Sequence, residues 1–284
     1  MKQLVLRNLR VYFRDKLSVF FSLLSVLVTF LVYLLFLGDV WSGDLPDVPG
    51  APDMMSGWIM AGLLSIASVT TTLGAAGIMV DDRTTKVRKD FEASPLSRAS
   101  LTGGYILSSF AVGSLMTTVG LILAEAYIVL NGGELLSLTQ LLKMLGLILL
   151  SVLSNTALLT FMVTFFKTNS SFGTASTLVG TLIGFLTGIY IPVGMLPQAV
   201  QGLVKLLPVS HTAVLMRQIF MEKPLQEVFS GAPQELISET LLSLGVRFTL
   251  NGSEVAPVVS VLFIAGAGIV FFALSAWRMT KKEK

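Results

Sequence analysis

The sequence predicts an all-α membrane protein with six transmembrane helices. Of the 284 residues, 53% are hydrophobic and only 13% are charged, against about 25% charged residues in an ordinary globular protein. A soluble chain of this size has too few charges to cover its surface. Its apolar runs are also long enough to cross about 30 Å of hydrocarbon as helix. These observations exclude the soluble, disordered and nucleic-acid-binding classes.

Six apolar runs are expected to form the spans. Each is uniformly apolar rather than alternating, which favours helices over strands. The first run is longer than the apolar core of a signal peptide and is followed by no small-x-small cleavage site, so it is expected to be retained. The predicted spans cover residues 17–37, 56–80, 103–130, 144–166, 172–191 and 257–277.

The distribution of Lys and Arg predicts the orientation. Basic residues crowd residues 1–16, the loop after the second span and the C-terminal tail, and Lys167 lies between the fourth and fifth spans. Residues 38–55 hold four Asp residues and no base. Because basic loops stay on the cytoplasmic side, both termini are expected to be cytoplasmic in a multi-pass protein of the cell membrane.

Residues 192–222 complicate the number of crossings. The segment is mostly apolar, but Pro192, Pro197 and Pro208 interrupt it. A full crossing would put the basic tail outside. A re-entrant helical hairpin that enters the outer leaflet and returns accounts for the apolar, proline-broken segment and keeps the basic tail inside, provided that protein covers its broken backbone. The alternative is an amphipathic hairpin lying on the membrane surface.

The first 16 residues have the pattern of an interfacial helix. Arg7, Arg10 and Arg14 lie on one narrow arc of a helical wheel, with apolar side chains beside them. Such a helix lies in the interface plane, with its arginines toward phosphate or water. The simpler alternative is topology-setting charge before the first span.

Residues 82–95 are expected to form a short charged helix between the second and third spans. Asp81 and Asp82 provide a helix start and Pro95 a stop. Val87 and Phe91 form an apolar i, i+4 pair on one face. A charged helix with one apolar side suits docking of a cytosolic partner; the alternative is a solvated connector.

Several chemistries find no support in the sequence. It has no cysteine and one histidine, His211, which excludes thiolate chemistry and a multi-histidine metal site. No G-x-x-x-x-G-K-S/T motif is present to hold nucleotide phosphates. Glu125 is the one acid well inside a span and is the candidate for ion coupling, although an acid this close to the interface is more often a hydrogen-bonded structural residue. An intramembrane hydrolase using His211 is the weakest hypothesis, because no G-x-S-x-G motif is present.

In the loop between the second and third predicted spans, and again after the fifth, the sequence resembles the permease subunits of ABC-2-type ABC exporters. The resemblance lies in Asp82-Arg83 followed by Pro95-Leu96-Ser97-Arg98, and in Pro192-Val193-Gly194-Met195-Leu196-Pro197 with Leu206-Leu207-Pro208-Val209-Ser210. The six spans, cytoplasmic termini and large last outer loop agree along the whole chain, residues 1–284, as one transmembrane domain. Thr84 and Lys86-Val87 depart from the family pattern, which often has an acid and then Gly-Thr there.

The resemblance implies that the 82–95 helix couples the chain to a separate ATPase subunit, braced by the N-terminal helix. ATP and Mg²⁺ would then be bound by that partner, with no cofactor, metal or catalytic residue in this chain, and the chain would be no enzyme itself. The residues expected to contact the ATPase are Asp82, Arg83, Val87, Phe91, Glu92 and Pro95.

Small and hydroxylated residues mark two further spans. Residues of the fifth span form a small-residue ridge that allows close helix approach, and the resemblance implies its use in a dimer with a second permease; packing within the chain is the alternative. Hydroxyls of the second span either line a polar-tolerant pathway or bond back to their own helix. The ridge comprises Ser176, Gly180, Gly184 and Gly188, and the pathway candidates are Thr70, Thr71, Thr72 and Glu125.

The function expected from these features is that of an ATP-driven exporter permease, acting in membrane lipid on a drug, peptide or lipid-like amphiphile. The alternative is an ion-coupled secondary transporter that uses Glu125.

Overall fold

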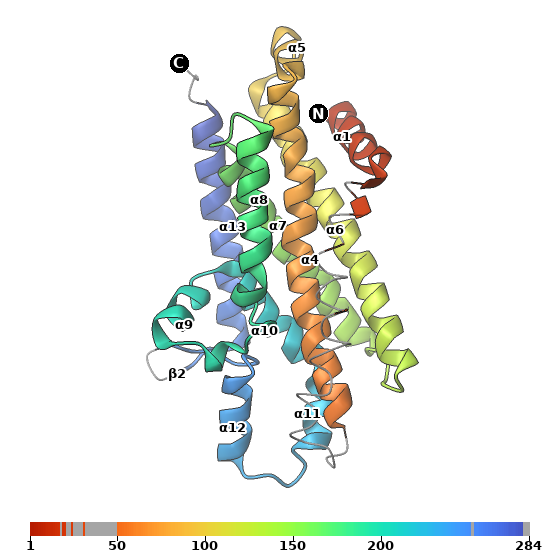
Figure 1. Cartoon of the computed structure of the whole chain (residues 1–284), viewed down its shortest axis with the longest axis vertical. Helices are drawn as coiled ribbons and strands as arrows, with labels where there is room; N and C mark the ends of the chain where they lie inside the picture. Colours follow the sequence, from red (N-terminus) through yellow and green to blue (C-terminus); the bar gives the residue numbers. More distant parts are fainter. Residues whose placement is uncertain (18, 21–23, 25–30, 32–49, 251–252, 281–284) are drawn as a thin grey trace.

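The computed structural model describes residues 1–17, 19–20, 24, 31, 50–250 and 253–280. Within these residues the structure is all-α apart from one pair of short strands (Figure 1). The first predicted span, 17–37, falls almost entirely outside the described residues. The helices are α1 Lys2–Arg14, α4 Ala51–Thr84, α5 Val87–Ala93, α6 Arg98–Leu130, α7 Leu138–Val163, α8 Asn169–Leu186, α9 Gln198–Lys205, α10 Pro208–Phe220, α11 Glu222–Val228, α12 Gln234–Ser243 and α13 Pro257–Thr280.

Four described helices are long and apolar enough to cross a membrane, or up to five if the bent α9–α10 pair counts as one span. The four are α4, α6, α7 and α13, which correspond to the second, third, fourth and sixth predicted spans. The fifth predicted span corresponds to α8, an 18-residue helix that ends at Leu186. The apolar runs therefore mark the long helices correctly, while the total of six spans stays a prediction.

Helix α4 lies at the centre of the bundle and packs against α6, α7, α8 and α10. Its middle is buried over nearly every residue, because apolar side chains cover all its faces. Helix α13 is far more exposed, as expected for a helix whose outer side meets lipid.

Hydroxyl and amide side chains join α4, α7 and α10 within this core. Asn155 Nδ2 donates to Ser68 Oγ at 3.0 Å, and Thr212 Oγ1 donates to Ser151 Oγ at 3.2 Å. Ser151 Oγ in turn donates to Ser68 Oγ. Interhelical hydrogen bonds of this kind fix helix register where the hydrophobic effect gives little direction.

The α5 end of the bundle carries α1 and the tip of α4, whereas α11 and α12 lie at the opposite end, here called the α11 end (Figure 1). Between α8 and α13 the chain forms the short 3-10 helix η2 Val193–Met195, the bent pair α9–α10, α11, α12 and the antiparallel strands β1 Thr249–Leu250 and β2 Ser253–Glu254. Helices α9 and α10 meet at 89°. A pair bent in this way is either a broken span or a re-entrant loop, so the expected hairpin over 192–222 stays a prediction.

Arg217 anchors this segment in an unusual way, since it is fully buried and no carboxylate pairs with it among the described contacts. Its guanidinium donates to the carbonyls of Thr187 at 2.9 Å and Gly245 at 3.3 Å, and lies 4.5 Å from the centroid of the Trp58 ring. Both carbonyls follow the ends of helices, α8 and α12, where the macrodipole is negative. Two helix C-termini therefore compensate the buried cation.

Candidate functional site

The last turns of α4 contact most of the other helices at the α5 end of the bundle. Asp82 is 1% exposed, and its carboxylate accepts hydrogen bonds from both terminal guanidinium nitrogens of Arg7, at 2.5 and 2.7 Å. Tyr105 of α6 donates its hydroxyl to the same carboxylate at 2.7 Å. A bidentate, charge-assisted pair with a third donor is strong and directional. Asp82 thereby holds α1 and α6 against α4.

Helix α1 is fixed by further contacts. Arg7 also donates to Asn8 Oδ1, and the buried Asn8 amide donates to Ser108 Oγ on α6 at 3.1 Å. The hydrogen bond with Asp82 raises the pKa of Arg7 against the opposing effect of burial. The Arg7 guanidinium lies 5.6 Å from the centroid of the Phe91 ring, within cation–π range. One arginine therefore contacts α1, α4 and α5.

Arg83 points to the other side of the bundle. Its Nη1 donates to the carbonyl of Phe166 at 2.6 Å, just beyond the end of α7. Asp81 accepts from the Asn169 amide at the start of α8, at 3.0 Å. Three consecutive residues thus tie α4 to α1 and α6, to α7, and to α8. The Asp-Arg pair supports the fold at this end, and its predicted role in docking stays a prediction.

The predicted helix over 82–95 has different boundaries. Helix α4 continues to Thr84, and a separate seven-residue helix, α5, begins at Val87. Lys86, with φ 67°, breaks the helix between them. The prediction placed the start at Asp82 because two acids favour a helix N-terminus, but here they lie inside the last turns of a continuous helix.

Helix α5 presents a charged face and an apolar face. Val87 and Phe91 are half-buried, and Phe91 packs on a cluster that includes Leu4 and Tyr105. Lys89 and Asp90 are exposed, as is Pro95 beyond the helix. The Glu92 side chain lies outside the described part of the structure. The apolar pair predicted as a docking surface thus faces largely inward, and the exposed surface is the charged one.

A groove of about 630 Å³ runs between α1, α4 and α8. Thr70, Ser176 and Gly180, three of the predicted site residues, lie along it, with Asp15 and Asp81 among its other lining residues. Thr71 and Thr72 do not line it: both are fully buried and donate to the carbonyls of Ala67 and Ser68 in their own helix. Thr70 Oγ1 also donates to a carbonyl of its own helix, that of Ile66 at 3.1 Å, so all three hydroxyls bond back to α4 and the predicted pathway role stays a prediction.

The predicted ridge on α8 is shorter than expected. Ser176 and Gly180 lie on the helix, and a Cβ at Gly180 would meet nothing within 4 Å. Gly184 packs against Tyr190 of its own chain. Gly188 lies beyond the helix at φ 72°, where Ile189 N donates to Gly184 O as in a Schellman cap. The i+4 spacing therefore includes a helix-ending glycine, and Gly188 is not a member of the ridge.

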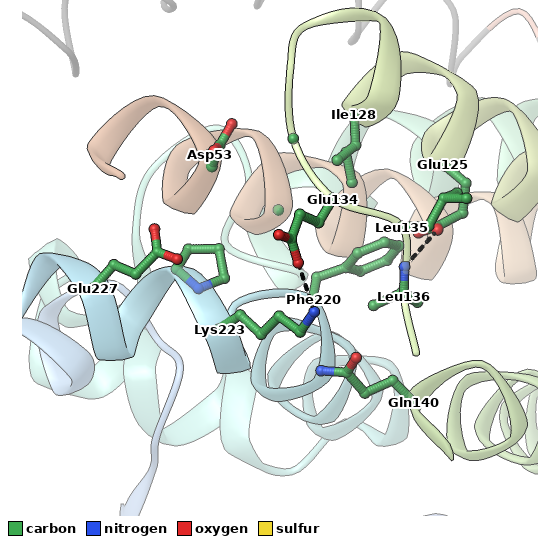
Figure 2. A pocket seen from close by; sticks show the side chains of 13 residues that line it. Asp53, Glu125, Ile128, Glu134, Leu135, Leu136, Gln140, Phe220, Lys223 and Glu227 are labelled. Carbon is green, nitrogen blue, oxygen red and sulfur yellow. Dashed lines mark hydrogen bonds and ion pairs between the residues drawn. The ribbon is translucent and has the colours of Figure 1, made fainter. Parts of the chain in front are cut away.

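Glu125 lies at the α11 end, in a small pocket (Figure 2). One carboxylate oxygen accepts from the backbone N–H of Leu136 at 3.0 Å, which holds the α6–α7 loop against α6. Across the same pocket, the exposed Glu134 and Lys223 pair at 2.7 Å. Each raises the charged fraction of the other, so the pKa of Glu134 falls and that of Lys223 rises. Within the described residues, the hydrogen bond from Leu136 gives Glu125 a structural role.

His211 is equally structural. Its Nε2 lies 2.9 Å from the carbonyl of Lys205, so Nε2 carries the proton and Nδ1 accepts from Ser260. The imidazole thereby joins α9, α10 and α13 through these two hydrogen bonds.

Sequence reasoning missed the residues that make the α5 end one unit. Arg7 was assigned to an arc facing phosphate or water, and Tyr105 and Asn8 were not singled out. A buried carboxylate that pairs with an arginine 75 positions away in the sequence leaves no local pattern. Lys89 could have been found, because it lies opposite Val87 and Phe91 on a helical wheel, and Asp90 lies at the edge of their face.

These helices define a multi-pass membrane protein whose α5 end is tied to one charged tip. Residues 48–277 match the family model described as ABC-2 family transporter protein. The chain therefore belongs to the ABC-2 family of transporters and is an ABC transporter permease. Permeases of this family are membrane transport components that work with ABC ATPase subunits. No curated protein matches the chain.

Proposed function

We propose that the chain is the membrane-spanning subunit of an ATP-driven exporter, with the α5 end in the cytoplasm of the cell and α5 docked on the ATPase. The observation that carries the proposal is the set of contacts at the tip of α4, directly before α5 in the chain. Asp82, Arg83 and Asp81 hold α1, α6, α7 and α8 to the tip of α4. Force applied at α5 would reach four helices through short, directed contacts.

Docking uses the exposed face of α5 rather than its apolar pair. Lys89 and Asp90 are exposed and opposite in charge, which suits polar contacts with a cytosolic subunit. Phe91 positions the helix by packing between the Arg7 guanidinium and the apolar cluster beneath. Val87 shares that inward side, and Glu92 and Pro95 remain candidates for the docking edge.

A second permease would complete the pathway along α8. Among the described residues, a Cβ at Gly180 would meet nothing within 4 Å, and small residues such as Ser176 and Gly180 allow close approach of a partner helix. The six-span topology, cytoplasmic termini, interfacial α1 and outer re-entrant hairpin belong to the same proposal. ATP and Mg²⁺ would be bound by the ATPase alone.

The test separates docking from folding. In the permease–ATPase complex reconstituted in lipid, Lys89→Glu combined with Asp90→Lys should reduce co-purification of the ATPase and its turnover, while the thermal stability of the permease is unchanged. Phe91→Asp should reduce both turnover and stability. The matched control is Lys143→Glu, on α7 away from α5. Normal ATPase binding and turnover in the Lys89–Asp90 double variant would overturn the docking assignment.

The ion-coupled alternative gains no supporting observation. Glu125 is engaged by the backbone of Leu136. Glu125→Gln keeps an acceptor for that N–H, and ATP-driven transport should persist in this variant.

A further inference from the structure

Helix α1 turns two cations away from the bundle. Its buried residues recur at every fourth position and face α4 and α6; they are Leu4, Asn8 and Tyr12. Arg10 and Arg14 lie one turn apart on the opposite side of the helix, and both are exposed. Arg7, predicted on the same arc, is instead engaged by Asp82. Within the described residues, neither Arg10 nor Arg14 makes a hydrogen bond or an ion pair.

An exposed apolar strip adjoins these two arginines. Leu6 and Phe13 are 39% and 38% exposed, and on a helical wheel they lie beside Arg10, on the side away from Arg14. The outer side of α1 therefore carries a basic strip and an apolar strip next to each other. This combination suits the boundary between phospholipid headgroups and acyl chains, where a helix meets phosphate on one side and hydrocarbon on the other.

The contacts of Tyr12 place this surface alongside an apolar part of the bundle. Tyr12 lies in one cluster with Ala75 of α4 and with apolar residues of α6. Ala75 lies seven residues before Asp82, which is roughly 10 Å along the helix from its charged tip. Arg10 and Arg14, on either side of Tyr12 in the sequence, thus lie at a level where α4 is apolar. A guanidinium at such a level extends toward the nearest phosphate or water.

The N-terminal segment itself supplies no anion to the basic strip. Asp15 is the one acid among residues 1–37. It lines the groove between α1, α4 and α8, whereas Arg10 and Arg14 do not line that groove. The predicted first span, 17–37, carries no charge at all. The strip therefore presents charge of one sign, and its complement is an anion from outside this segment.

We propose that the outer side of α1 binds anionic phospholipids, with the headgroup phosphate at Arg10 and Arg14 and an acyl chain along Leu6 and Phe13. Charge complementarity selects an anion, and the adjoining apolar strip selects a lipid over a free anion, which would leave that strip uncovered. Because Arg7 of the same helix holds Asp82, a lipid that binds the packed position of α1 also stabilises the α5 end. An effect of the lipid on ATPase coupling rests on the proposed function.

The test compares phosphatidylglycerol, which is anionic, with phosphatidylcholine of the same acyl chains, which carries no net charge. Native mass spectrometry of the purified chain, released from nanodiscs that contain both lipids, should show preferential retention of phosphatidylglycerol. Arg10→Gln and Arg14→Gln should each weaken this binding by about five-fold, the loss expected for one basic residue at an anionic membrane surface. Arg14→Lys keeps the charge without the forked geometry and should weaken it less. Phosphatidylglycerol should also raise the thermal stability of the wild type, but not that of the Arg10–Arg14 double variant.

The matched control is Lys143→Gln, which removes one exposed basic residue near the start of α7. An equal loss of binding in this control would assign the effect to net charge and overturn the site. Displacement of phosphatidylglycerol by inorganic phosphate would assign a free anion, and equal retention of the two lipids by the wild type would remove the charge preference; either result overturns the proposal. Phe13→Ala should weaken binding without a change of charge, and full binding in this variant would overturn the placement of the acyl chain.

The outcomes separate the lipid site from the proposed function. In the permease–ATPase complex, phosphatidylglycerol should raise ATP turnover of the wild type more than that of the Arg10–Arg14 double variant. Arginine-dependent lipid binding without this effect would contradict the link to coupling and leave the lipid site standing. Loss of ATPase co-purification from the double variant in phosphatidylcholine alone, with lipid retention unchanged, would assign this side of α1 to the ATPase and overturn the lipid. Lipid binding is measured without the ATPase, so a failed docking test at Lys89 and Asp90 would contradict the proposed function alone.

Discussion

The two ends of the bundle bury an arginine in different ways. At the α5 end, Arg7 is about one-third exposed and pairs with the carboxylate of Asp82. Toward the other end, Arg217 is fully buried, and its partners among the described residues are two backbone carbonyls and the Trp58 ring. The first cation is neutralised by an opposite charge, the second by dipoles.

This difference has a consequence for motion. The Arg7–Asp82 pair can break more readily, because Arg7 is about one-third exposed and can be hydrated, while Asp82 keeps the hydrogen bond from Tyr105. Arg217 instead joins the C-terminal ends of α8 and α12, and releasing it would leave a buried charge and two unsatisfied carbonyls. We therefore expect the α5 end to transmit movement and the Arg217 junction to stay rigid.

The largest effect is expected for Arg217→Ala. It leaves a cavity and two buried carbonyls without donors, and should lower the free energy of unfolding by about 3–5 kcal/mol. Thermal denaturation in detergent measures this loss. Arg217→Lys keeps the charge but not the forked geometry, and should lower the free energy of unfolding by less than Arg217→Ala. Wild-type stability in both variants would contradict the rigid junction at Arg217.

A smaller effect is expected for Asp82→Asn. The Tyr105 and Arg7 contacts would each keep one weaker hydrogen bond, and the cost should be about 1–3 kcal/mol, discounted because Arg7 is partly solvated. Because an ion pair is screened, high salt should narrow the gap between Asp82→Asn and wild type, whereas it should leave the Arg217→Ala gap unchanged. Equal salt dependence at both ends would remove the distinction between them.

Next in size is Gly188→Ala, with Gly180→Ala as its control. Gly188 has φ 72°, and its new Cβ would lie 2.6 Å from Val193 Cγ2, so this change should cost about 1–2 kcal/mol. Gly180 lies within α8 with open space around it, and Ala there should be neutral or stabilising. Thermal denaturation of the two variants, compared side by side, tests whether the rigid Arg217 junction includes the cap of α8 at Gly188.

The smallest effect belongs to the exposed pair Glu134–Lys223. Lys223 lowers the pKa of Glu134, so the pair stabilises the fold at neutral pH and its contribution is lost as the pH falls through that lowered value. Stability measured against pH should therefore show a slight deficit for Glu134→Gln at neutral pH that disappears in acid. A deficit that grew in acid would contradict the assigned partner.

Much of the helical layout could be predicted from the sequence, because apolar length is a local property. The runs at 103–130 and 257–277 fall within α6 and α13, and the run at 144–166 extends three residues past the end of α7. Boundaries were less certain at the tip of α4, where Asp81 and Asp82 resemble a helix start although the helix continues to Thr84. Gly188 was misassigned because i+4 spacing does not distinguish a helix face from a helix cap.

The candidate site was predicted only in part. The loop was found, and so was the presence of Thr70, Ser176 and Gly180 on spans two and five, which the structure brings to one groove. The inward direction of Phe91 and the partners of Asp82 were not found. Both depend on α1 crossing the end of the bundle, a contact between residues 75 positions apart.

The sequence alone determined that the chain is helical and belongs in a membrane, since composition and run length fix how much apolar surface must avoid water. Only the tertiary structure decided which charges meet. Arg7 with Asp82, and Arg217 with the ends of α8 and α12, are contacts across the bundle, and burial penalises a charge until the fold brings its partner within hydrogen-bonding distance.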